Sequence, residues 1–177
     1  MSILVDSNII IYTHNKDSPF YKKARNFLDS WLRRKKVYFA FQNLLESYSI
    51  LTSIRILEKN KAFEIVKFYF YHPNSIILYP TNKTAAILFQ LLNKYQIMGE
   101  RTYDFHLIAL MIENHLETIY SKNTKDFQKI KEYPINRCSS QRKLISLKVK
   151  VPLKYFSTIG SGIKPSKNGT STKLLLI

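Results

Sequence analysis

An aspartate stands inside an apolar stretch at the start of the chain. Ile3–Val5 precedes Asp6, and the isoleucine run Ile9–Ile11 follows it. A β-branched apolar run is typical of a strand buried on both faces, where a carboxylate is costly unless it is paired or bound to a cation. The chain has only 12 acidic residues to place, so Asp6 is the first candidate for a chemical role.

Further polar residues stand at comparable positions, just after a predicted strand or in the first turn of the next helix. Asp104 shares its helical face with apolar residues three, four and seven positions on, so its carboxylate should point inward. Glu46 begins the helix after the second predicted strand, and Asn123 and Asp126 follow the last predicted strand. Each also has an ordinary interpretation, as a helix cap or a favourable charge at a helix start.

As a set, these acids predict a metal site. Two carboxylates about 4 Å apart repel by roughly 4 kcal/mol at an effective dielectric constant of 20. A cluster of three or four would therefore take up protons or a cation, and an all-oxygen site favours Mg²⁺ or Mn²⁺. Such ions activate water and stabilise the leaving oxygen in phosphodiester hydrolysis. An acidic metal pocket in a basic protein is the expected electrostatic layout of a nuclease.

The elements that position these residues alternate along the chain. The predicted strands are Ile3–Val5, Val37–Phe41, Ser75–Tyr79 and Thr118–Tyr120. The predicted helices are Phe20–Trp31, Leu44–Leu57 with Asn43 as its cap, Ala62–Tyr71, Thr84–Tyr95, Asp104–Asn114 and Asp126–Lys131. This alternation predicts an α/β fold with a parallel sheet covered by helices on both faces. Ligands of such sheets bind beyond the carboxyl ends of the strands, which is where the acids fall.

Composition limits the alternatives. Of 177 residues, 45% are hydrophobic and the net charge is +16, values that suit a globular protein attracted to polyanions. Cys138 is the single cysteine, which excludes an intramolecular disulfide framework and predicts an intracellular, cytoplasmic setting. No apolar run approaches the roughly 18 residues of a membrane helix, and no signal peptide is visible, so we expect no membrane association.

The charge is uneven. Residues 138–177 hold eight Lys and Arg residues and no acid, whereas residues 1–137 hold 20 basic and 12 acidic residues. We therefore predict a nuclease domain over 1–137 and a basic, poorly ordered extension over 138–177. The plausible phosphate contacts in the first part are Arg33, Arg34, Lys35, Lys36 and Arg101, although a run of charges is more often a solvated face.

Four segments together resemble a known family. LVDSNIIIY, NLLES, YDFHLIALMIENH and IYSKNTKDF, in this order and at this spacing, are similar to the PIN domain, in particular to the VapC-like ribonuclease toxins. The resemblance covers about residues 1–136. It departs from the family at His115-Leu116-Glu117, where a glycine usually precedes the last strand, and in the segment after Arg137, which has no counterpart in a compact member.

The resemblance implies a three-layer α/β/α sandwich with a central, mainly parallel sheet and a Mg²⁺- or Mn²⁺-dependent endoribonuclease. It implies that Asp6, Glu46 and Asp104 are the core carboxylates. The fourth position falls on Asn123, with Asp126 as the alternative acid, and Ser7 and Asn8 are supporting polar residues. The implied biology is the toxin of a type II toxin–antitoxin pair, with RNA as substrate and an antitoxin as partner. We also expect a homodimer, for which Phe68–Tyr71 offers a face.

Two other functions compete with the nuclease. A non-catalytic RNA-binding or scaffold protein on a degenerate PIN-like fold would use the charge for affinity and the acids only for structure. A phosphatase with Asp6 as nucleophile is weaker, because that chemistry usually needs a second acid two residues on, where the chain has Asn8.

Overall fold

The structure is a computed structural model, and it describes residues 2–123, 135–137 and 145–149. The strands are β1 (Ile3–Val5), β2 (Val37–Ala40), β3 (Ser75–Leu78), β4 (Thr118–Ser121), β5 (Ile135–Arg137) and β6 (Ile145–Val149). The helices are α1 (Ser7–His14), α2 (Tyr21–Arg34), α3 (Phe41–Ser53), α4 (Lys59–Tyr71), α5 (Asn82–Tyr95) and α6 (Arg101–Glu113). In the described part of the chain, no helix is both long and apolar enough to cross a membrane.

The strands form one sheet in the order β3-β2-β1-β4-β6-β5. β1 pairs in parallel with β2 on one side and with β4 on the other, and β2 pairs in parallel with β3. β6 is antiparallel to both β4 and β5. The predicted mainly parallel sheet is therefore confirmed. Ile145–Val149, inside the segment predicted as an extension, forms a strand of this sheet, while the division into two regions stays a prediction.

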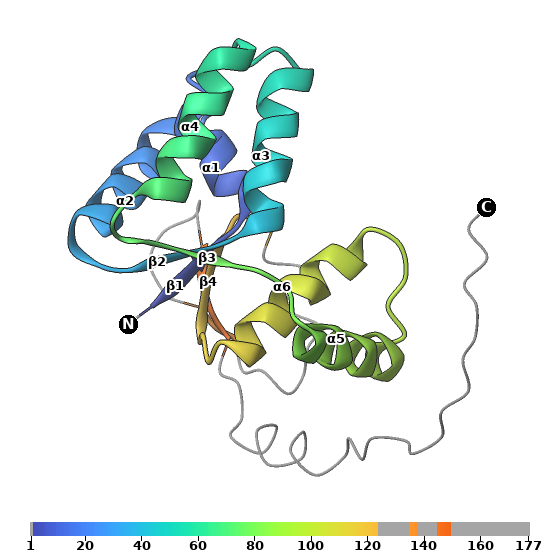
Figure 1. The fold of residues 1–177 in the computed structure, drawn as a ribbon. Coiled ribbons are helices and arrows are strands. Elements are labelled where there is room, and N and C mark those ends of the chain that lie inside the picture. Colours follow the sequence, from blue (N-terminus) through green and yellow to red (C-terminus); the bar gives the residue numbers. More distant parts are fainter. Residues whose placement is uncertain (1, 124–134, 138–144, 150–177) are drawn as a thin grey trace.

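Helices cover both faces of the sheet, which confirms the predicted sandwich (Figure 1). On one face, α5 and α6 pack on Leu4, Ala40 and Ile119. On the other, α1, α2 and α4 pack on the alternate strand residues, among them Val5 and Phe39. Because residues of β1 enter both cores in turn, this strand is buried throughout, as its apolar sequence requires.

Three predictions about elements need correction or completion. Helix α1 was not predicted, and it places Ile9 and Ile10 in the core with no exposure. The predicted cap Asn43 is wrong: α3 begins at Phe41, and the Asn43 amide instead donates a 3.0 Å hydrogen bond to the Val5 carbonyl. The predicted helix Asp126–Lys131 lies outside the described residues.

Two local features of the backbone mark the start of α5 and the turn after α6. A capping box starts α5: the Thr81 hydroxyl accepts hydrogen bonds from the backbone of Lys83 and Thr84, and the Thr84 hydroxyl accepts one from the Thr81 backbone. His115, in the turn between α6 and β4, has φ of +55°. This left-handed conformation favours glycine, which the resembling family usually has there.

Candidate active site

A cleft of about 570 Å³ lies beyond the carboxyl ends of the parallel strands. Among the residues that line it are the described catalytic and supporting residues of the predicted site and one of the predicted basic contacts: Asp6, Ser7, Asn8, Glu46, Arg101, Asp104 and Asn123. They come from the end of β1 and the start of α1, from α3, from α6 and from the residues after β4. The parallel topology thus brings together residues that are more than 110 positions apart in the chain.

Asp6 is fixed at the back of this cleft by three hydroxyl and amide donors. It is 7% exposed. The Ser121 hydroxyl donates to Oδ2 at 2.6 Å, the Asn8 amide donates to the same oxygen at 2.5 Å, and the Ser7 hydroxyl donates to Oδ1 at 3.3 Å. These donors account for how a carboxylate can be tolerated at the end of a buried strand.

The surroundings still disfavour the charged form of this carboxylate. Burial is the main cause that raises the pKa of Asp6 above its usual value, and the negative charge of Glu46 raises it further. The hydrogen bonds from Ser121 and Ser7 act in the opposite direction. A cation bound between Asp6 and Glu46 would favour the charged form of both carboxylates and offset their repulsion. A raised pKa of this origin is therefore typical of a cation site.

Glu46 projects from α3, one turn after Asn43. The Asn43 amide bonds to the carbonyl of Val5, the residue before Asp6, and the Ser47 hydroxyl donates to the Asn43 carbonyl at 2.6 Å. These buried contacts hold the start of α3 against the end of β1. Glu46 itself is exposed, so its carboxylate can approach a ligand in the cleft at little desolvation cost.

Asp104, on α6, and Asn123, after β4, are the remaining predicted site residues that line the cleft. Asp104 lies in the first turn of α6 and is partly buried, which fits the predicted inward direction. The Asn123 backbone N–H donates to the Ser121 hydroxyl at 3.0 Å, so the loop after β4 is tied to the same network. Asp126, the alternative to Asn123, lies outside the described residues.

The predicted basic contacts separate into two places. Arg101 lines the cleft beside Asp104. The run Arg33–Lys36 does not line it and precedes β2, at the amino end of the parallel strands. Its role in RNA binding stays a prediction.

The donor set suits a hard cation. Carboxylate and amide oxygens are the ligands that Mg²⁺ and Mn²⁺ prefer. Among the residues that the structure describes, no three His, Cys, Asp or Glu side chains are grouped closely enough to hold an ion. Mg²⁺ commonly keeps several waters and binds through only one or two carboxylates, so a closed protein cage is not required.

Sequence reasoning missed one central residue of this site. Ser121 bonds directly to Asp6 but was assigned no role, because the predicted strand ended one residue earlier, at Tyr120. Its signal was available: it is a polar residue at the carboxyl end of a strand, the position that had already selected Asp6. Gln42 and Tyr103 also line the cleft and were not predicted.

Comparisons with known proteins agree with this geometry. The sequence matches the PIN domain over residues 3–133. It is 27% identical over 121 residues to Ribonuclease VapC37 of Mycobacterium tuberculosis, which covers 66% of this chain and 84% of that protein. The fold is similar to that of Mycobacterium tuberculosis VapC20, a sarcin-ricin loop cleaving toxin, with a TM-score of 0.58 and 13% identity over 71% of this chain and 92% of that one.

A second solved structure has the same fold. VapBC2 from Rickettsia felis, bound to a DNA fragment from its promoter, gives a TM-score of 0.56 and 16% identity over 74% of this chain and 94% of that one. With the family match spanning most of the chain and the acidic cleft at the expected edge of the sheet, the chain belongs to the PIN domain family.

Proposed function

We propose that this protein is a divalent-metal-dependent endoribonuclease that acts in the cytoplasm as the toxin of a type II toxin–antitoxin pair. The observation that carries the proposal is that Asp6, Glu46 and Asp104 line one cleft, where burial, and to a smaller extent the charge of Glu46, disfavours the charged form of Asp6. Family membership and the ribonuclease named above support the same activity.

In this proposal, carboxylates of Asp6, Glu46 and Asp104 would hold Mg²⁺ or Mn²⁺, directly or through waters that the ion keeps, with Asp126 or Asn123 as the fourth group. When bound, the ion would supply a water of lowered pKa and would stabilise charge on the phosphodiester oxygens. Ser121 and Asn8 hold the Asp6 carboxylate in one orientation through bonds of 2.6 Å and 2.5 Å. Such partners usually decide the orientation and basicity of a ligand.

The cleft also limits what can react. A cleft of about 570 Å³ has room for a nucleotide and its phosphates. Arg101 in its wall supplies a positive charge beside Asp104, which favours a polyanionic chain over a neutral substrate. RNA phosphodiesters, bound with the scissile group facing Asp6, fit these two features.

The test is RNA cleavage with matched acid-to-amide substitutions. Wild type should cleave RNA with Mg²⁺ or Mn²⁺ and stop when EDTA is added. Asp6→Asn, Glu46→Gln and Asp104→Asn should each abolish detectable cleavage, whereas Glu117→Gln, an exposed acid outside the cleft, should not. Calorimetric titration with Mn²⁺ gives a second readout, in which Asp6→Asn should weaken binding.

The competing outcome is a non-catalytic RNA-binding protein. RNA binding without metal-dependent cleavage, and without Mn²⁺ binding, would replace the enzyme with that alternative. The partner part of the proposal is tested separately. Solved relatives of this fold include a Klebsiella pneumoniae toxin–antitoxin complex, so co-expression with a small protein encoded next to this gene should yield a complex and relieve growth inhibition. The mass of the purified chain alone tests the predicted homodimer.

A further inference from the structure

A lysine that directly precedes the cleft residue Asn123 is held by two aromatic rings. The ammonium of Lys122 lies 4.2 Å from the ring centroid of Phe20 and 5.4 Å from that of Tyr12. These two rings are 5.1 Å apart and tilted by 45° to each other. A cation over two ring faces is attracted by both, so the head group of this exposed side chain has a preferred place.

This lysine is coupled to the acidic network by its backbone. The Lys122 N–H donates to Asn8 Oδ1 at 3.2 Å, and the Asn8 amide in turn donates to Asp6. Its two neighbours in the chain are Ser121, which bonds to Asp6, and Asn123, which lines the cleft. Tyr12 stands one helical turn after the cleft residue Asn8 on α1 and therefore lies on the same side of that helix.

Aromatic contacts hold a cation without neutralising it. The ion pairs among the described residues are Arg25–Asp29 and Lys67–Glu64, and neither involves Lys122. A lysine paired with a carboxylate would be unavailable to an anion, whereas one over rings keeps its charge and its donors. The acids of the cleft repel a phosphate backbone, so a fixed positive charge just outside them is where an approaching strand would be anchored.

We propose that Lys122, positioned by Tyr12 and Phe20, binds a backbone phosphate of the RNA next to the scissile one. This inference rests on the proposed function, since it names how the substrate of the same cleft is held. Lys122 contacts the substrate, and the two rings are positioning residues. The competing interpretation is that the lysine stem only covers the rings, which predicts an effect on stability and none on RNA binding.

The experiment separates charge from packing. Binding of a single-stranded RNA labelled with fluorescein is measured by anisotropy, in EDTA so that no cleavage occurs, over a series of salt concentrations. Lys122→Met keeps the apolar stem and removes the charge, and Lys122→Arg keeps the charge. Lys61→Met makes the same change on an exposed lysine of α4, a helix that contributes no residue to the lining of the cleft. Thermal unfolding of each variant reports the packing contribution.

We compare plots of the logarithm of the RNA association constant against the logarithm of the salt concentration. For a single strand, loss of one phosphate contact should make this plot less steep by about 0.7. Relative to 1 M salt, this corresponds to about fivefold weaker binding than wild type at 0.1 M salt. We expect this of Lys122→Met and not of Lys122→Arg or Lys61→Met. An unchanged slope in Lys122→Met overturns the proposal, whatever its melting temperature, even if wild type cleaves RNA.

The two proposals fail in different ways. A wild type that binds RNA with a Lys122-dependent slope but never cleaves it loses the enzymatic function and keeps the phosphate contact. A wild type that neither binds nor cleaves RNA loses both, whereas one that cleaves RNA with Mg²⁺ but binds it without a Lys122-dependent slope loses only the phosphate contact.

Discussion

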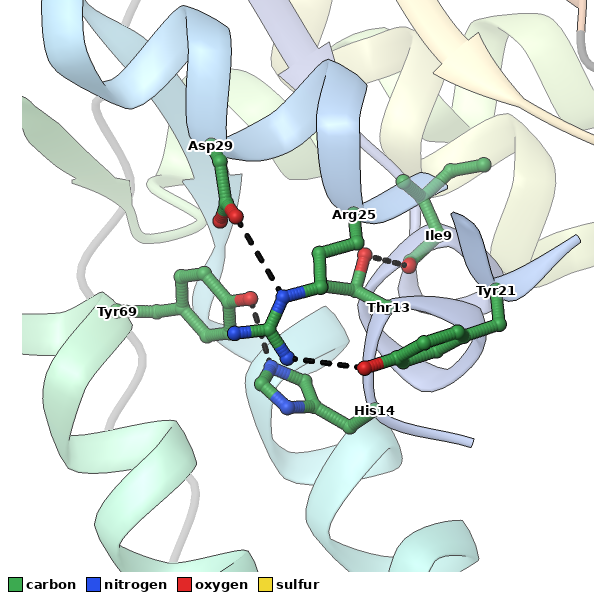
Figure 2. Close-up of polar contacts among 7 residues, drawn as sticks. All are labelled: Ile9, Thr13, His14, Tyr21, Arg25, Asp29 and Tyr69. Carbon is green, nitrogen blue, oxygen red and sulfur yellow. Dashed lines mark hydrogen bonds and ion pairs between the residues drawn. The ribbon is translucent and has the colours of Figure 1, made fainter. Parts of the chain in front are cut away.

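A partly buried histidine should make the protein less stable in mildly acidic solution. In the last turn of α1, His14 Nε2 lies 2.8 Å from the Tyr69 hydroxyl on α4, and the two rings meet edge to face (Figure 2). Burial lowers the pKa of His14 from 6.5 to about 4; the positive charge of Arg25 adds to this, and Asp29 opposes it. Arg25 is itself held by Tyr21 and Asp29 (Figure 2).

The pKa difference sets the size of the effect. Because the folded-state pKa is depressed, the stabilisation is fully present above pH 6.5 and is lost as the pH falls towards 4. At about 1.4 kcal/mol per pKa unit, the free energy of unfolding should fall by about 2 kcal/mol between pH 8 and pH 5, and by about 3 kcal/mol at pH 4.

The assay is chemical unfolding of wild type and His14→Gln at several pH values. Glutamine can still bond to Tyr69 but does not titrate, so the difference between the two proteins isolates His14. The raised pKa of Asp6 contributes with the opposite sign, since that stabilisation is lost as the pH rises, but it is common to both proteins and cancels. His115→Gln, at an exposed histidine, is the control. Parallel pH profiles for wild type and His14→Gln would refute the reasoning.

Three further outcomes follow from the same structure. Ser121→Ala removes a donor that lowers the pKa of Asp6, so the pKa of the metal-free carboxyl should rise further. Calorimetric Mn²⁺ binding, which competes with the proton on Asp6, should then be lost at a higher pH than in wild type, and an unchanged pH dependence would contradict the role of Ser121. Thr81→Ala removes the capping box of α5 and should lower the free energy of unfolding by about 1 kcal/mol, measured in urea, whereas Thr81→Ser should not. His115→Gly should raise the free energy of unfolding by up to about 1 kcal/mol, because it relieves a left-handed backbone, and a loss of stability would show that the His115 side chain matters more than its φ of +55°.

The fold was largely predictable because most elements carry a clear period. Strands β1 to β4 and helices α2 to α6 were predicted within a few residues at each end. Helix α1 was missed for a physical reason. Ile9, Ile10 and Ile11 are β-branched and favour strands locally, but Ile9 and Ile10 are fully buried here, and that packing overrides propensity. The strand β6 was missed although Ile145–Val149 alternates apolar and polar residues, because the whole segment after Arg137 was interpreted from its charge and composition.

The location of the site followed from topology more than from residue types. In a parallel sheet the ends of β1, β2 and β4 share one edge, so Asp6, Glu46 and Asn123 had to meet there once the order of elements was known. Distances within the network could not follow from sequence. That Asn43 bonds to a strand carbonyl rather than capping its helix depends on α3 beginning at Phe41, three residues earlier than a cap at Asn43 requires.

Asp6 shows how a local rule and a functional requirement conflict at one residue. It occupies the N-cap position of α1, where an aspartate normally accepts hydrogen bonds from the first turn of its own helix, yet its side chain makes no such cap. Its oxygens instead accept from Ser121 and Asn8. Forgoing a cap costs about 1 kcal/mol, and burying the carboxylate adds to that cost. Such violations of local preference are expected where function requires the side chain elsewhere, so the direction of the Asp6 side chain, more than its presence, supports a catalytic role for this edge of the sheet.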